Sequence, residues 1–561
     1  MRFPRLNARR WLHPQAWLAA LALLVTVPVQ AAEELVFPYW APMESYLPIS
    51  SIETYVRDNK VDEKLANYFK YLKPEEQSIV RQAMRYSSSL KPFPVSQVLY
   101  SPMGVVVLSS LGNLIQTGPE MNGFYAIRSA IILSATDPQG LSILGVMRHF
   151  PSNSIRINVS LALQLASKLT QFVDVTNEVV QAIETENKAQ ASTEAPINLA
   201  TLVSVQASGP FQVSKQPLML QDKSRNRNVP TDLYVPVFKE QRPTSIPVVV
   251  FSHGLGDTRK FNASYMESLA SYGFVVVSPE HIGSDFAQQV RLLAGLENEI
   301  FRPSEFYEQP RDVTYVLNVL QEKNANEFGG RLNLQNVGVF GNSFGGYTVL
   351  VLGGATVDFT RLQQECKQDY LLQTLNISLL FQCRALDLES SPQLKALLTS
   401  GQLQDPRVKF VMAISPFTSA ILGPSGISRI KVPVVLFGGS YDLAAPMVRE
   451  QVEAFSWLTT TDKYLLSSNA VSHSPQFTEL INHFLLPSLS KDELKEKTAL
   501  YQKKFRGISL AFMQVYVAGK SEYRPYLQAS YAETFADPPF DLSLIRSFPP
   551  DRLDPFLSKL P

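Results

Sequence analysis

A serine lies between two glycines where a short apolar stretch meets a run of small and apolar residues. Ser343 is flanked closely by Gly341 and Gly345, residues 336–340 precede this group, and residues 346–350 follow it. Glycines at such positions allow a sharp turn from a strand into a helix, which holds a serine hydroxyl clear of the strand end. Ser343 is therefore a candidate nucleophile. The pattern is short enough to arise by chance, so other residues must support it.

An acid and a histidine follow this serine at suitable positions. Asp442 comes just after the apolar residues 434–437, and His473 lies in a small polar turn beyond residues 463–466. A serine hydroxyl is a poor nucleophile at neutral pH, so a neutral imidazole must accept its proton, and a carboxylate orients that imidazole. We predict that Ser343 attacks, that His473 is general base and then general acid, and that Asp442 orients His473.

A second glycine-containing segment lies upstream of the serine. His253, Gly254, Leu255 and Gly256 follow the apolar residues 248–251. Acyl transfer needs two hydrogen-bond donors aimed at the oxyanion. In this arrangement they are usually the backbone N–H of the residue after the nucleophile and one in a loop of this kind. We assign these donors to Phe344 and Leu255.

Each assignment has an alternative. The serine could be an elbow serine in an inactive hydrolase, and Asp442 could cap the helix expected a few residues later, because Asp favours N-caps. Glu280 or Asp285 would then be the candidate acids. Among the six histidines, His473 fits the general base best. Its rival His483 falls in an apolar helical pattern, where a structural role is expected.

Alternating strand and helix patterns from residue 246 to residue 486 predict a mostly parallel sheet with helices on both faces. The predicted strands end near His253, Glu280, Asn342, Ser415, Gly438 and Ser467. The candidate residues then gather at the carboxyl ends of strands, where ligands bind in open α/β sheets. Together with the chain order Ser, Asp, His, this predicts an α/β-hydrolase fold preceded by a mainly helical N-terminal domain.

The chain is long enough for more than one domain. The predicted segments are a helical domain at 33–186, a linker at 187–198, a catalytic domain at 199–490 with a helical insertion at 356–404, and a C-terminal helical extension at 491–561. The insertion follows the nucleophile helix, so it could form a lid over the pocket or a surface excursion.

Composition narrows the possible partners. Apolar residues make up 45% of the chain, charged residues 18%, and the net charge is +1. This balance predicts a large folded core and gives no sign of nucleic-acid binding. No zinc-type cluster, phosphate-binding loop or dinucleotide fingerprint is evident in the sequence. We therefore expect no metal or cofactor, and a small-molecule or lipid ester as the partner; the sequence does not predict an oligomeric state.

The first 31 residues read as a secretory signal peptide. Arginines at positions 2, 5, 9 and 10 form a basic start, residues 17–27 form an apolar core, and residues 29–31 form a small-residue cleavage site. Cleavage after Ala31 would give a periplasmic or secreted protein, and no later segment reads as a membrane span. The two cysteines, Cys366 and Cys383, could form one local disulfide in an oxidising compartment; two buried thiols are the alternative.

Several of these segments resemble plasma-type platelet-activating-factor acetylhydrolases. They are residues 248–256, residues 269–277 with Glu280 and His281, and residues 343–346. The resemblance extends over about residues 205–485, with the HGLG and SFGG segments its most specific parts. Residues 97–102 and 122–126 are similar to an uncharacterised domain found ahead of secreted cyanobacterial hydrolases, which implies architecture but no activity.

The chain departs from the acetylhydrolase pattern at two places. Asn342 stands where that family usually has histidine before the serine. Residues 409–415, the strand after the nucleophile, end in Ser415 where the family has its acid, so the acid should come from the next strand, as Asp442. The resemblance implies cleavage of lipid or short-chain acyl esters, with an acetyl-phospholipid as the leading substrate. A catalytically silent binding or envelope-scaffold protein is the alternative function.

Overall fold

The computed structural model describes residues 31–40, 43–198, 200, 202, 205, 207–238, 243–367, 369–474, 490–535 and 538–560. The predicted signal peptide, apart from Ala31, and His483 lie outside these residues. Contacts divide the chain into two compact units, one of Met1–Ser96 with Leu111–Ala162 and one of Gln97–Ser110 with Leu163–Pro561.

The first unit is mainly helical, as predicted, but it also contains a small sheet that the sequence did not reveal. Its strand order is β2-β1-β7-β4-β5. The strands are β1 (Glu34–Trp40), β2 (Met43–Pro48), β4 (Ile115–Gly118), β5 (Met121–Asn122) and β7 (Ser154–Ile157). Helices α2 (Ile49–Asp58), α3 (Glu63–Phe69), α4 (Pro74–Arg85), α7 (Phe124–Ser134) and α8 (Ile143–Arg148) belong to the same unit.

A long helix corrects the predicted domain boundary. α9 (Val159–Ala191) continues without a break through residue 186, so the start of the expected linker is helical, and the two compact units divide at residue 162. The Ala-, Glu- and Gln-rich residues that suggested a linker are also good helix formers. Asn187 is fully buried, and its side chain accepts a hydrogen bond from the backbone N–H of Leu544 at 2.8 Å.

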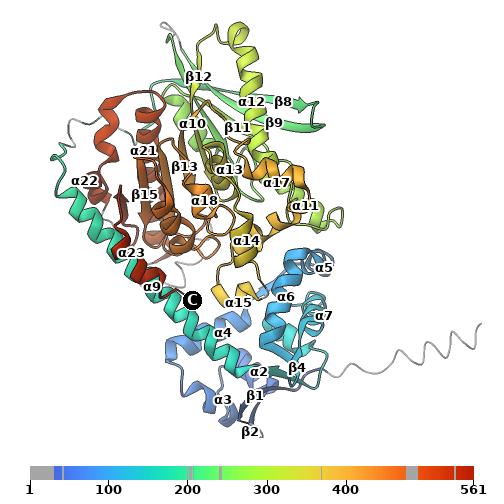
Figure 1. Cartoon of the computed structure of the whole chain (residues 1–561). Coiled ribbons are helices and arrows are strands. Elements are labelled where there is room, and N and C mark those ends of the chain that lie inside the picture. Colours follow the sequence, from blue (N-terminus) through green and yellow to red (C-terminus); the bar gives the residue numbers. More distant parts are fainter. Residues whose placement is uncertain are drawn as a thin grey trace, which may run out of the picture. The chain divides into compact units, whose positions relative to one another are not determined.

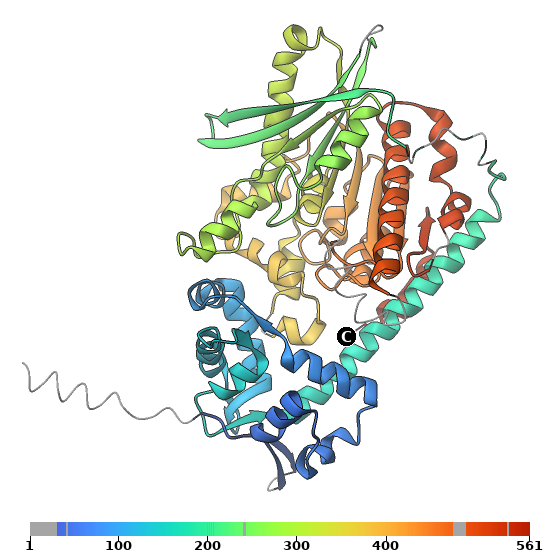
Figure 2. The same ribbon diagram turned by 180° about the vertical axis from the view of Figure 1, so that it is seen from behind.

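The second unit is built on a nine-stranded sheet with the order β16-β15-β14-β13-β12-β10-β11-β9-β8 (Figures 1 and 2). Six central strands pair in parallel, and β8, β9 and β16 pair antiparallel at the edges. The strands are β8 (Gln212–Asp222), β9 (Arg227–Val237), β10 (Ile246–Ser252), β11 (Val275–Pro279), β12 (Leu332–Asn342), β13 (Val408–Ile414), β14 (Val434–Gly439), β15 (Lys463–Ser468) and β16 (Leu542–Ile545).

Helices cover both faces of this sheet because its strands are apolar on both sides. In β10, Val248 and Val250 pack with α12 (Glu305–Glu327) and α13 (Phe344–Leu352). The alternate residues, Val249 and Phe251, pack with α10 (Ala263–Ser271) and α21 (Lys491–Tyr516). The predicted doubly wound α/β arrangement is therefore present.

The segment at 491–561 is more than a helical extension. α21 buries residues such as Ile508 and Phe512 in the core of the sheet, and β16 pairs with β15 as an edge strand. β16 was not predicted, because its four residues are too few to show a strand pattern. Residues after 490 therefore belong to the second compact unit.

The insertion at 356–404 is helical, as predicted. It consists of α14 (Phe359–Glu365), α15 (Tyr370–Thr374), α16 (Leu379–Gln382), the 3-10 segment η2 (Cys383–Leu388) and α17 (Pro392–Thr399). Cys366 and Cys383 form a disulfide with a Cα–Cα distance of 5.6 Å.

Among the described residues, no single helix has the length and apolar character needed to cross a bilayer. Only the sharply bent pair α5 (Pro92–Tyr100) and α6 (Pro102–Leu114) would qualify, and only if taken together.

Candidate active site

Ser343 lies in a strained turn between β12 and α13. Its φ is 57° and its ψ is −116°, a left-handed conformation that is rare for a residue with a side chain. Glycine is needed nearby because the backbone is crowded. A Cβ on Gly345 would lie 2.0 Å from the carbonyl oxygen of Ser252, and one on Gly341 would lie 2.3 Å from the carbonyl oxygen of Gly345. The turn therefore holds the serine against the end of β10.

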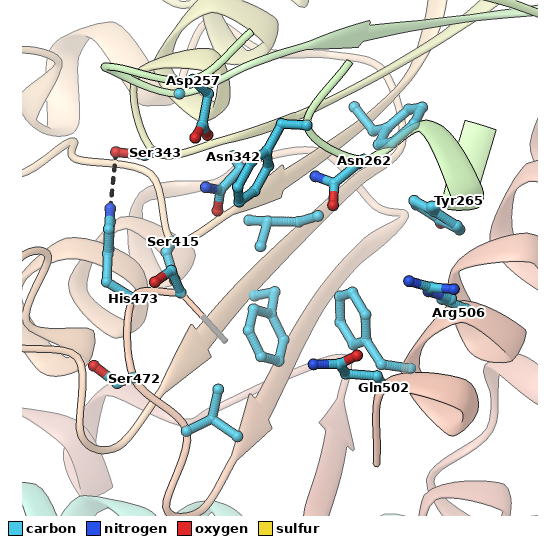
Figure 3. Close-up of a pocket in the computed structure, with 18 of the residues that line it drawn as sticks. Asp257, Asn262, Tyr265, Asn342, Ser343, Ser415, Ser472, His473, Gln502 and Arg506 are labelled. Carbon is cyan, nitrogen blue, oxygen red and sulfur yellow. Dashed lines mark hydrogen bonds between the residues drawn. The ribbon is translucent and has the colours of Figure 1, made fainter. Parts of the chain in front are cut away.

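The three predicted catalytic side chains come together at the carboxyl ends of the strands. His473 Nε2 lies 2.8 Å from Ser343 Oγ (Figure 3). On the other side of the ring, His473 Nδ1 lies 2.8 Å from Asp442 Oδ2. An ionised carboxylate can only accept a hydrogen bond, so Nδ1 carries the proton and Nε2 of the neutral ring is free to accept the serine proton. This geometry is compatible with the roles predicted for Ser343, His473 and Asp442, which remain predictions.

Asp442 contacts His473 and also binds its own loop, but it does not cap a helix, because the helical segment that follows begins at Val448 and has Met447 as its N-cap residue. The Asp442 side chain is fully buried, and Oδ1 accepts hydrogen bonds from the backbone N–H groups of Ala444 at 3.0 Å and Ala445 at 2.8 Å. Oδ2 is directed at His473. The loop N–H groups therefore fix the carboxylate that in turn fixes the imidazole.

Charge and burial act in opposite directions on His473. Burial lowers the pKa of His473, but the attraction of the Asp442 carboxylate and its hydrogen bond outweigh burial, so the pKa is raised. Asp257 faces the same site, and burial raises the pKa of its carboxyl to about 6. The negative charge of Asp257 adds a smaller upward contribution to the pKa of His473.

The loop at residues 253–256, here called the oxyanion loop, lies directly beside the nucleophile. A Cβ on Gly254 would be 3.2 Å from Cβ of Ser343. Leu255 lines the same cavity as Ser343, and Phe344 begins α13 immediately after the serine. This placement is compatible with the predicted role of the Leu255 and Phe344 N–H groups, which remains a prediction.

A cavity of about 320 Å³ opens from Ser343 between the sheet and α21 (Figure 3). Much of its wall is apolar and comes from Phe251, Phe340, Ile414, Phe437 and Val471. One face of α21 completes the wall with Thr498, Tyr501, Gln502, Phe505 and Arg506. Among the described residues, none that lines this cavity comes from the insertion at 356–404, and its role as a lid remains a hypothesis.

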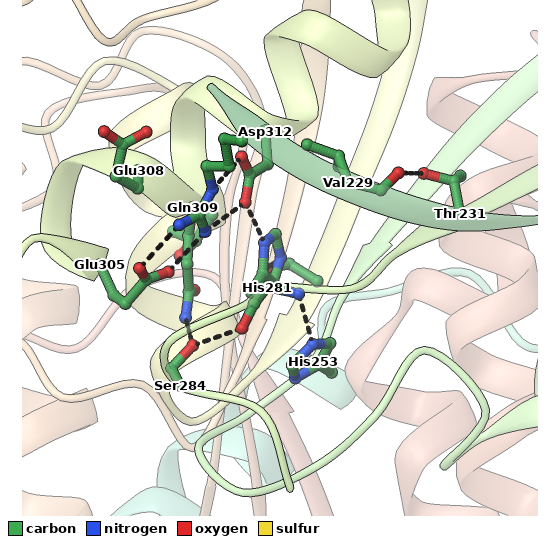
Figure 4. A network of polar contacts seen from close by, with 12 residues as sticks. Val229, Thr231, His253, His281, Ser284, Glu305, Glu308, Gln309 and Asp312 are labelled. Carbon is green, nitrogen blue, oxygen red and sulfur yellow. Dashed lines mark hydrogen bonds and ion pairs between the residues drawn. The ribbon is translucent and has the colours of Figure 1, made fainter. Parts of the chain in front are cut away.

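A buried network beneath the oxyanion loop was not anticipated from the sequence (Figure 4). Ser252 Oγ lies 2.9 Å from His281 Nε2, and His281 Nδ1 lies 3.2 Å from Asp312 Oδ2. These residue types match those of the candidate triad, but all three residues are fully buried and none lines the cavity. Ser252 therefore cannot meet a substrate. The only sequence signal was an acid within the apolar face of a helix, at Asp312.

The buried anchor of the insertion is a carboxylate. Glu450 is fully buried, and its Oε1 accepts hydrogen bonds from Asn376 at 2.7 Å, Ser378 at 2.7 Å and Gln382 at 3.0 Å. These three donors belong to the insertion, so Glu450 ties it to the body of the unit.

Within the part of the chain that the structure describes, no group of three or more His, Cys, Asp or Glu side chains could hold a metal ion.

Two family models match parts of the chain. One, described as alpha/beta hydrolase of unknown function (DUF1400), matches residues 31–158 and thus covers most of the first compact unit rather than the nine-stranded sheet. The other, platelet-activating factor acetylhydrolase, isoform II, matches residues 228–290. This second match runs from β9 into α11 (Phe286–Leu293) and includes the oxyanion loop. Fold and matches together show that the chain is an α/β-hydrolase resembling platelet-activating-factor acetylhydrolases.

Proposed function

We propose that this hydrolase cleaves carboxylic esters through an acyl-enzyme formed on Ser343. The observation that supports it best is the chain of contacts from Ser343 through His473 to Asp442 beside an apolar cavity. The Ser343 oxygen would attack the ester carbonyl while its proton passes to Nε2 of His473. The bond to the leaving alcohol then breaks, and the alcohol takes that proton.

Water would complete the cycle. His473 removes a proton from water, the resulting hydroxide attacks the acyl group, and the carboxylic acid leaves as Ser343 recovers its proton. The N–H groups of Leu255 and Phe344 would stabilise the oxyanion that forms in each half of the reaction. The Asp442 carboxylate would keep His473 in the required tautomer.

A fluorophosphonate probe tests this proposal, because it labels only an activated serine. We expect the wild-type protein to be labelled on the peptide that contains Ser343 and the Ser343→Ala variant to remain unlabelled. Ser252→Ala is the matched control, since Ser252 also contacts a histidine but is buried; this variant should keep the label on Ser343. A folded wild type that takes up no label would support the catalytically silent binding or scaffold protein instead.

The substrate is proposed from the cavity and the family resemblance. The apolar wall suits an acyl or alkyl group, and the acetylhydrolase resemblance favours short-chain or lipid esters, with acetyl-phospholipid first. The test is a panel of p-nitrophenyl esters of rising chain length beside phospholipids, galactolipids and an amide. Preference for short acyl chains would support the acetylhydrolase analogy, and a clear preference for long chains or the amide would refute it.

Export is proposed from the basic and apolar start of the sequence, and the Cys366–Cys383 disulfide is compatible with an oxidising compartment. Sequencing the N-terminus of the mature protein tests it. We expect the first residue to be Ala32, and a mature chain that still begins at Met1 would contradict cleavage after Ala31.

A further inference from the structure

We propose that His253 is a positioning residue that aims the N–H of Leu255 at the reacting carbonyl. The proposal rests on the proposed function, because it explains how the oxyanion loop would be held ready for ester cleavage. His253 is fully buried and lines no part of the cavity, so it acts through the loop and not by touching the substrate.

The partners of His253 determine which ring nitrogen carries the proton. The backbone N–H of His281 donates to His253 Nε2 at 2.9 Å (Figure 4), and a backbone N–H can only donate. Nε2 is therefore the acceptor of a neutral ring, and Nδ1 carries the hydrogen. Nδ1 lies 2.8 Å from the carbonyl oxygen of Gly254, so it donates to that oxygen. Burial keeps the ring neutral by lowering the pKa of His253 to about 3.

Holding the carbonyl oxygen of Gly254 also fixes the direction of the Leu255 N–H. The carbonyl of Gly254 and the N–H of Leu255 belong to the same planar trans peptide unit, in which they point in opposite directions. The Gly254 oxygen accepts from His253 Nδ1 and also from the N–H of Asp257 at 3.2 Å. These two bonds prevent rotation of the peptide unit, and the direction of the Leu255 N–H is therefore fixed before any substrate binds.

The histidine that supports His253 is itself held from several sides. His281 Nδ1 donates to Asp312 Oδ2, and the guanidinium of Arg227 binds the same carboxylate with distances of 2.7 and 2.8 Å. The rings of His281 and His253 lie 4.9 Å apart. The loop is also tied at its far end, where the N–H of Gly256 donates to the carbonyl oxygen of Ser284 at 2.7 Å. Buried residues, two of them charged (Arg227 and Asp312), therefore hold the oxyanion loop through His281 and His253.

The test compares three substitutions of His253. His253→Leu removes both contacts and should lower kcat roughly 10²–10³-fold, as loss of one oxyanion donor does elsewhere. His253→Asn places an N–H donor near the position of Nδ1, and His253→Gln places only an acceptor near that of Nε2. We therefore expect kcat of His253→Asn to be at least about tenfold higher than kcat of His253→Leu, because Asn can donate to the Gly254 oxygen. His253→Gln should have a kcat close to that of His253→Leu.

Measurements per active site separate positioning from a general loss of structure. The fluorophosphonate titrates the fraction of competent protein, and kcat is expressed per titrated site. KM and the acid limb of the pH profile should stay at their wild-type values, since Ser343, His473 and Asp442 are untouched. His149→Leu is the matched control, because it breaks a comparable contact with Asp137 at 2.7 Å in the first compact unit. It should leave kcat unchanged.

The outcomes distinguish this inference from the proposed function. An active wild type whose His253→Leu variant has the same kcat per titrated site would overturn the role of His253 alone. Equal kcat values for the His253→Asn and His253→Gln variants would also overturn the role of His253. This comparison remains valid if the His253→Leu variant does not fold. A folded wild type that is neither labelled nor active would refute ester cleavage and this role with it.

Discussion

The substitution Gly345→Ala probes how closely the nucleophile turn approaches the end of β10. The added Cβ would lie 2.0 Å from the carbonyl oxygen of Ser252, 2.6 Å from its carbonyl carbon and 2.8 Å from the carbonyl oxygen of His253. Comfortable contacts between non-bonded atoms begin at about 3.5 Å. These are backbone atoms of a buried central strand, so α13 must move away by more than about 1 Å.

Two effects of that movement can be estimated. Inserting a methyl group into a well-packed core costs about 1–3 kcal/mol. A displacement of about 1 Å at a reacting group can lower the rate about 10²-fold, because the 2.8 Å contact between Ser343 and His473 is disturbed. Alanine is otherwise favoured over glycine in a helix by about 1 kcal/mol. Without the steric contact, Gly345→Ala would therefore stabilise the protein. A decrease in stability would thus indicate that the contact is present.

The assay combines thermal unfolding with steady-state hydrolysis of a p-nitrophenyl ester. We expect Gly345→Ala to unfold at a lower temperature than the wild type and to lose about 10²-fold in kcat. Gly118→Ala is the control, because its Cβ would meet only the flexible side chain of Met121, at 3.1 Å. A Gly345→Ala protein with unchanged or higher thermal stability and a kcat within about threefold of the wild type would refute the reasoning.

Three further predictions concern the triad, its pH dependence and the disulfide. Asp442→Asn should lower kcat about 10⁴-fold in a folded protein, because His473 loses its required tautomer; near-normal turnover would contradict the assignment. The pKa of His473 is raised above the ordinary 6.5, so the imidazole becomes protonated as pH falls through that higher value. We expect kcat/KM to be lost over the same pH range. Asp257→Asn removes a nearby negative charge, so it should move this acid limb to lower pH; a limb that stays in place would rule out their interaction. Replacing Cys366 and Cys383 by serine should lower stability by about 3 kcal/mol while kcat is retained, and two free thiols in non-reduced protein would contradict the disulfide.

The parts of the fold that could be predicted are those with local signals. Each of the six central parallel strands contains a short apolar run, and the predicted ends lie within one residue of those observed. Ser343, Asp442 and His473 could be found because each follows such a strand. Strand order then places them together at one edge of the sheet.

The parts that could not be predicted depend on contacts between distant residues. β1 pairs in parallel with β7, about 120 residues later, although neither has a long alternating pattern. The network at His281 depends on Asp312 in α12 and Arg227 in β9, which share no sequence motif. Residues 187–191, the end of α9, were expected to start the linker because their composition is typical of linkers as well as of helices. The contact of Asn187 with β16, which distinguishes the two, is visible only in the structure.

The face that α21 presents to the cavity has a consequence for how selectivity could change. Its lining residues run from Thr498 to Arg506, a distance of about 12 Å along the helix axis. No triad or oxyanion-loop residue belongs to this helix, so substitutions along it would alter the room for a substrate chain without moving the reacting atoms. Chain-length preference could therefore drift, or be redesigned, turn by turn along one helix while the chemistry stays constant.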